Sequence, residues 1–159
     1  MLAIERVLVP IDFSTPSLRA LDEAVEFSRP YEAELIVMFA VERSESALLE
    51  PGSEAHLEHQ AQEAEEKLEE ICRSLGRRGV TCRTLIEFGA ASEAIVDAAK
   101  KVHANLIVMS THGRSGLAHV LIGSVAERVV RLACCPILLL RNLAETDGPE
   151  SKTPSRAKA

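Results

Sequence analysis

Short apolar runs without polar alternation recur along this chain, and each is followed by a longer segment with helical spacing of its apolar residues. The runs span residues 7–11, 35–41, 80–88, 106–109 and 137–140. Uninterrupted apolar runs are typical of strands covered on both faces, as in parallel sheets. The alternation predicts a single-domain α/β fold, a five-stranded parallel doubly wound (Rossmann-like) sheet with helices on both faces. Polar Arg83 and Glu87 in the third run place that strand near an edge of the sheet.

The helical segments carry recognisable start signals. Thr15 followed by Pro16 is typical of an N-cap and a first helical position. Apolar residues spaced by three and four over 57–75 predict the clearest amphipathic helix of the chain. Ser124 and Glu127 have the spacing of a capping box, which predicts that the last helix begins there.

Composition argues against partners that are recognised by bulk charge. The formal net charge is −6, and the chain has one Tyr, four Phe and no Trp. An acidic chain with few aromatic rings is poorly suited to nucleic acid or to an anionic membrane surface. The longest nearly apolar run, 132–140, is about half of what a membrane-spanning helix needs. Glu5 and Arg6 interrupt any apolar signal-peptide core, so the expected location is cytoplasmic.

Two further expectations concern the tail and the cysteines. Residues 142–159 contain one Leu and two Pro among charged and small residues, which predicts a disordered C-terminal tail after a domain spanning 1–141. The cysteines lack C-x-x-C spacing and have no histidine at zinc-finger spacing, so reduced and mostly buried thiols are expected. They are Cys72, Cys82, Cys134 and Cys135.

Candidate binding residues follow the first, second and fourth strands, where a parallel sheet places its ligand site. Asp12 and Ser14 follow the first strand, and a Gly-containing loop after the fourth leads to Gly123 and Ser124. Glycines let a backbone approach an anion, and a helix beginning at Ser124 directs N–H groups and partial positive charge to the same place. This arrangement favours phosphate binding. The alternative is that the glycines only turn the chain and Ser124 only caps a helix.

Rival nucleotide motifs are missing. The chain has no G-x4-G-K-[S/T], which excludes a P-loop NTPase, and no G-x-G-x-x-G after the first strand, which argues against a dinucleotide dehydrogenase. His112 is expected to bond loop backbone rather than to act in catalysis, because no acid to orient it is identifiable nearby. His56 and His59 are expected on a solvated helix face rather than at a metal.

The spacing Ser110-x2-Gly113-x9-Gly123-Ser124, together with Asp12 and Ser14 near the start, resembles the universal stress protein family over about residues 3–141. The nucleotide-binding branch of that family carries G-x2-G-x9-G-[S/T], and Ser110 here replaces the first glycine. The resemblance implies that Asp12 lies beside adenosine, that the Val41 backbone reads the adenine edge, and that the loop and Ser124 surround the phosphates. The site residues implied in this way are Pro10, Asp12, Val41, Met109, Ser110, Gly113, Arg114, Gly116, Gly123, Ser124 and Val125.

The same resemblance implies a function. The expected ligand is ATP, or AMP or ADP, with Mg²⁺ as a candidate counter-ion, and the expected role is a stress-response sensor or regulator without fast turnover. Two alternatives stay open, a dimeric interaction protein with an empty pocket and a slow ATPase. A homodimer through residues 137–141 is expected because four aliphatic residues at a sheet edge would otherwise invite aggregation.

Overall fold

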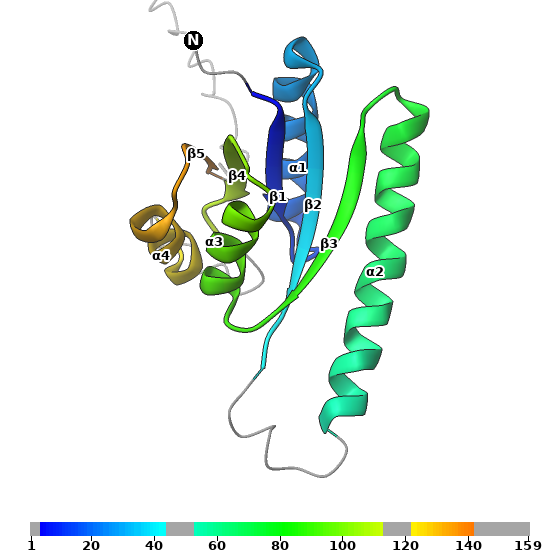
Figure 1. Ribbon diagram of the computed structural model, residues 1–159, viewed down its shortest axis with the longest axis vertical. Helices are drawn as coiled ribbons and strands as arrows, with labels where there is room; N and C mark the ends of the chain where they lie inside the picture. Colours follow the sequence, from blue (N-terminus) through cyan, green and yellow to red (C-terminus); the bar gives the residue numbers. More distant parts are fainter. Residues whose placement is uncertain (1–3, 44–52, 113–121, 142–159) are drawn as a thin grey trace, which may run out of the picture.

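The computed structural model describes residues 4–43, 53–112 and 122–141, and its centre is one parallel sheet (Figure 1). The strands stand in the order β3-β2-β1-β4-β5, and every neighbouring pair is parallel. They are β1 (Arg6–Pro10), β2 (Glu34–Val41), β3 (Cys82–Phe88), β4 (Leu106–Ser110) and β5 (Ile137–Leu140). This architecture confirms the predicted fold class, and β3 lies at an edge as its polar residues indicated.

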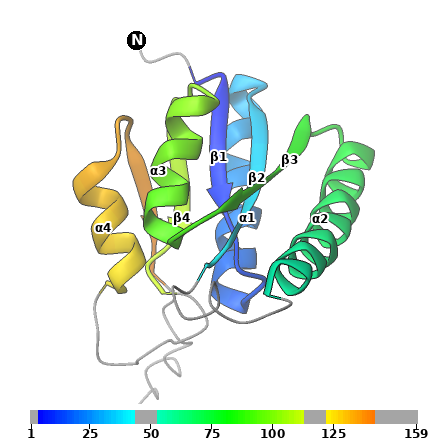
Figure 2. The same ribbon diagram turned by 60° about the horizontal axis from the view of Figure 1, so that its bottom comes forward.

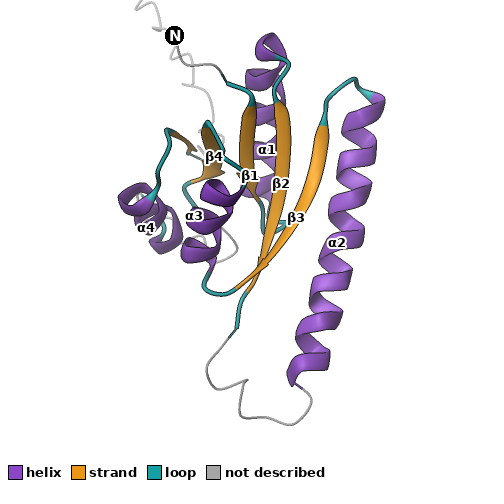
Figure 3. Ribbon diagram, viewed as in Figure 1, coloured by secondary structure: helices purple, strands orange, loops and turns teal. Residues whose placement is uncertain are grey.

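Helices cover both faces of the sheet. The helical elements are α1 (Thr15–Ser28), the 3-10 turn η1 (Arg29–Tyr31), α2 (Ser53–Arg77), α3 (Ala91–Lys101) and α4 (Ser124–Leu132). Two separate apolar clusters form, one between the sheet and α1 and α2, the other between the sheet and α3 and α4. Figures 2 and 3 show this arrangement, with α3 and α4 on the face opposite α1. Among the described helices, none is both long enough and apolar enough to cross a membrane.

Burial on both faces explains why the strand sequences do not alternate. Val7 and Val9 of β1 pack in the cluster beneath α1 and α2, whereas Leu8 packs in the cluster on the other face. All three side chains are fully buried. Because successive side chains of a strand point to opposite faces, a central strand covered on both sides needs an apolar residue at every position.

Both predicted N-caps are wrong by one residue, although α4 begins at Ser124 as predicted. Ser14, not Thr15, is the N-cap of α1, and its hydroxyl accepts from the Ser17 N–H at 3.4 Å. α4 has Gly123 as its N-cap, so Ser124 is the first helical residue and forms no capping box. In both helices the extended N-cap residue stands one position before the residue that the spacing suggested, a difference that local sequence preference does not resolve.

The expectation of reduced, mostly buried cysteines is wrong for Cys72 and Cys82, which form a disulfide, and for Cys134, which is exposed. A disulfide joins Cys72 in α2 to Cys82 at the start of β3, with 5.2 Å between their Cα atoms. The chain reverses between them, so residues ten apart in sequence meet where the helix passes into the strand. Cys134 is exposed. Burial is the main cause and the neighbouring Cys134 a second cause that together raise the pKa of Cys135 to about 11. That thiol is therefore protonated at neutral pH.

The disulfide gives the first prediction. Closing a loop of this length restricts the unfolded chain and should stabilise the oxidised protein by about 2–3 kcal/mol. Urea unfolding of the wild type should therefore shift to lower urea when a thiol reductant is added. The double variant Cys72→Ala, Cys82→Ala should unfold near the reduced wild type and should not respond to reductant. Equal midpoints for oxidised and reduced wild type would contradict the bond.

Candidate functional site

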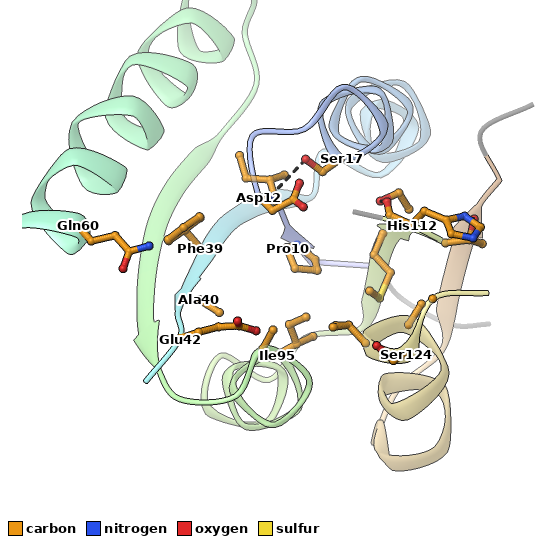
Figure 4. A pocket seen from close by; sticks show the side chains of 18 residues that line it. Pro10, Asp12, Ser17, Phe39, Ala40, Glu42, Gln60, Ile95, His112 and Ser124 are labelled. Atoms are coloured by element: carbon orange, nitrogen blue, oxygen red, sulfur yellow. Dashed lines mark hydrogen bonds between the residues drawn. The ribbon is translucent and has the colours of Figure 1, made fainter. Parts of the chain in front are cut away.

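A cleft of about 350 Å³ opens where the carboxyl ends of β1, β2 and β4 meet (Figure 4). This is the edge at which the strand order reverses direction, because β2 lies on one side of β1 and β4 on the other. The cleft is lined by Pro10, Ile11, Asp12, Ser17, Phe39, Ala40, Glu42, Gln60, Ala91, Ile95, Met109, Ser110, Thr111, His112, Gly123, Ser124, Val125 and Ala126.

Most of the residues singled out from the sequence come together in this cleft. Those that line it are Pro10, Asp12, Met109, Ser110, Gly123, Ser124 and Val125. Gly113, Arg114 and Gly116 lie outside the described residues. Val41 is described and does not line the cleft.

Val41 is the one described residue of the predicted site that does not line the cleft. The Val41 side chain is fully buried, and its carbonyl accepts from the Gly89 N–H at 3.0 Å, on the β3 side of β2. Alternate residues of a strand bond to opposite neighbours, so the backbone groups of Ala40 face the β1 side. Ala40 is the residue that lines the cleft. At the end of β2, the backbone that faces the cleft is thus that of Ala40, one residue before the position implied by the resemblance.

The turn after β1 holds Asp12. Asp12 Oδ1 accepts from the Ser14 N–H at 3.0 Å and from the Ser14 hydroxyl, while the Asp12 N–H donates to Ser17 Oγ at 3.3 Å. Phe13, with φ of 62°, takes the left-handed conformation and stacks on Phe39, the ring centres 5.2 Å apart. The Phe13–Phe39 stacking and the bonds to Ser14 and Ser17 hold this turn, and with it the Asp12 carboxylate, at the cleft. Asp12 thus contacts the start of α1 without being its N-cap.

A second set of polar contacts follows β4. The Ser110 hydroxyl donates to the His112 carbonyl at 2.6 Å, and the Thr111 hydroxyl lies 3.0 Å from His112 Nδ1. Ser110 and Thr111 are both buried. The Ser110 side chain is thus directed along the backbone. His112 Nδ1 therefore has a side-chain hydroxyl as a partner, and the expectation that the ring bonds loop backbone stays a prediction.

Gly123 brings α4 to the end of β4. Its N–H donates to the Thr111 carbonyl at 2.7 Å, and a Cβ at this position would lie only 2.9 Å from the same oxygen. The φ of Gly123 is −71°, an ordinary value, so glycine is needed here for the close approach of two backbones. As the N-cap, Gly123 has no side chain that could accept from the first N–H groups of α4. The first turn of the helix therefore presents these backbone N–H groups at the cleft.

The described lining is mostly apolar, and its ionised groups are acidic. Asp12 and Glu42 carry carboxylates, and the described part of the lining contains no Lys or Arg. No cluster of three or more His, Cys, Asp or Glu side chains suited to a metal occurs among the described residues. His56 and His59 are exposed on α2, as expected, with His59 Nδ1 lying 3.9 Å from Glu63.

Sequence reasoning did not single out Ala40, Glu42 or Gln60 as individual site residues. The segment 40–42 was recognisable as the end of a strand, but its register on the sheet was not. Gln60 lies on the polar side of the amphipathic pattern of α2, where solvent is the ordinary expectation, and yet it lines the cleft.

Comparison with known proteins supports one family. A sequence model described as the universal stress protein family matches residues 3–141. Universal stress protein MJ0531 of Methanocaldococcus jannaschii is 34% identical over 139 residues, covering 86% of this chain and 82% of that protein. The solved structure of MJ0577, from the same organism, has a TM-score of 0.79 at 27% identity and covers 87% of this chain and 96% of its own. A universal stress protein solved in complex with cAMP has a TM-score of 0.60 at 27% identity, covering 87% and 98%.

Gly123 gives a prediction with a matched control of opposite sign. Gly123→Ala places a Cβ against the Thr111 carbonyl and should destabilise the fold by about 1–3 kcal/mol. Gly76→Ala, in α2 with no atom within 4 Å of the new Cβ, should be neutral or stabilising by up to about 1 kcal/mol. Thermal unfolding of both variants measures this. Equal effects at the two positions would show that the close approach is unimportant.

Proposed function

Because this chain belongs to the universal stress protein family, we propose that it binds an adenine nucleotide, ATP or its di- or monophosphate, in the cleft between β1, β2 and β4. The observation that carries the proposal is the contact of Gly123 with Thr111, which sets the first turn of α4 at one end of the cleft. Backbone N–H groups at a helix N-terminus suit the phosphates. The relative solved with cAMP supports the class of ligand.

The proposed nucleotide runs across the carboxyl ends of the strands. Its phosphates lie at Gly123, Ser124 and Val125, its ribose hydroxyls donate to Asp12, and its base lies near Ala40 at the other end of the cleft. Gly113, Arg114 and Gly116 remain proposed phosphate contacts. Mg²⁺ bound with the nucleotide would be held by the phosphates themselves and would neutralise part of their charge.

We propose binding without rapid turnover, as in a sensor or regulator of a stress response. Efficient phosphoryl transfer uses a lysine on the phosphates and a hydroxyl on the metal, and the sequence has no P-loop motif to supply them. The proposed location is the cytoplasm, where thiol reductants would act on the Cys72–Cys82 bond. Residues 142–159 are proposed to form a disordered tail.

The binding experiment compares two aspartates. Asp12→Asn keeps an acceptor for the Ser14 N–H but removes the charge that the ribose hydroxyls meet, so ATP affinity should fall about tenfold or more. Asp22→Asn, exposed on α1, removes the same charge far from the proposed contacts and should leave affinity near that of the wild type. Calorimetry with ATP measures both. A folded wild type that neither binds ATP nor releases nucleotide on denaturation would overturn the proposal.

We also propose a homodimer through β5. Among the described strands, β5 pairs with β4 alone. The carbonyls of Pro136 and Leu140 accept from Ile107 and Thr111, so alternate residues of this segment face β4. Ile137 and Leu139 therefore direct their backbone groups outward, where an identical strand can pair about a two-fold axis.

The dimer is tested at Leu139. Leu139→Pro removes the outward N–H and keeps the bonds to β4, whereas Leu139→Ala shortens the side chain and keeps the N–H. Sedimentation at micromolar concentration should give a dimer for the wild type and for Leu139→Ala, and a monomer for Leu139→Pro. A monomeric wild type would refute the pairing.

A further inference from the structure

Resting on the proposed nucleotide site, we propose that Glu42 determines purine specificity, because its side chain lies near Ala40 at one end of the cleft and its carboxylate favours a 6-amino purine over a 6-oxo purine. Glu42 and Ala40 both line the cleft. Ala40 is the last but one residue of β2, and Glu42 follows directly after the strand ends. Figure 4 shows Glu42 near Ala40 and Ile95, at the end of the cleft away from Ser124.

The direction of β2 orders the hydrogen-bonding groups at this end. The last residue pair between β1 and β2 is Pro10 with Met38, so Ala40 lies beyond the paired part of β1. Its backbone faces that side, because Val41 bonds to Gly89 on the opposite side. Along a strand the N–H of a residue precedes its C=O. A base edge laid against Ala40 therefore meets a donor first and an acceptor next, and the acceptor is on the Glu42 side.

Adenine matches this order and 6-oxo purines oppose it. The N1 atom of adenine accepts and its 6-amino group donates, so the amino group lies against the Ala40 carbonyl with a second hydrogen left for Glu42. Guanine and hypoxanthine carry a proton on N1 and an acceptor oxygen at position 6. That oxygen would meet both the carbonyl and an ionised carboxylate, which can only accept.

Glu42 is distinguished from its neighbours by this chemistry. It is the only ionised side chain that the described lining contributes at this end of the cleft, where Phe39 and Ala40 are apolar. Gln60 also lines this end, but an amide both donates and accepts and can adapt to either base. The Arg43 guanidinium lies 5.7 Å from the centre of the Phe88 ring, so the next residue along the chain is engaged with β3.

The test is the ratio of affinities for ATP and inosine triphosphate. Both ligands carry the same phosphates, so a change in overall charge cancels in the ratio. The wild type should prefer ATP by at least about tenfold. Glu42→Gln supplies an amide donor for the 6-oxo group and should lower that preference about fivefold or more. Glu42→Ala removes the repulsion without adding a donor and should give an intermediate ratio.

Glu23→Gln, at an exposed position on α1, is the matched control and should keep the wild-type ratio. Binding of ATP with a ratio that Glu42→Gln and Glu42→Ala leave unchanged would overturn the role of Glu42 and leave the proposed function standing. A folded wild type that binds neither nucleotide would overturn both. Calorimetry with each purified variant gives all of these affinities.

Discussion

Parallel pairing on both sides of β1 is the constraint on which the rest of the structure depends. β1 lies between β2 and β4, and its apolar side chains are buried on both faces. Since all five strands run in one direction, their carboxyl ends share one edge of the sheet. Asp12, Ala40 and Ser110 are far apart in the sequence and meet at that edge for this reason alone. The cleft is therefore a result of topology, and its chemistry is supplied by the residues that leave each strand.

The sequence predicted the fold well because burial on both faces of a strand leaves a direct mark on composition. The register of β2, which decides which of its residues faces the cleft, is not evident from the sequence. Val41 and Ala40 are both small and apolar, and only the bond from Gly89 to the Val41 carbonyl reveals which of them turns its backbone to the cleft. Gln60 could not be predicted as a site residue for a related reason. A polar residue on the polar side of a helix is expected to face solvent, and the sequence does not show that it lines a cleft instead.

Long-range pairing was the other limit of sequence reasoning. Cys72 and Cys82 show no short spacing motif, and their bond depends on how α2 and β3 meet after the chain reverses. Gly123 was singled out as a glycine that lets the backbone approach an anion, and the structure adds a second reason for glycine there. Its conformation is ordinary, and what excludes a side chain is the Thr111 oxygen, a neighbour set by tertiary structure.

The bond between the Gly123 N–H and the Thr111 carbonyl also makes the position of α4 independent of the length of the connection that precedes it. It joins the two ends of the connection between β4 and α4, so the start of α4 is fixed to the sheet by its own contact. Residues inserted into or deleted from that connection would enlarge or shrink a closed ring without moving the helix terminus. Such a junction lets evolution vary the connection while the helix N-terminus keeps its place.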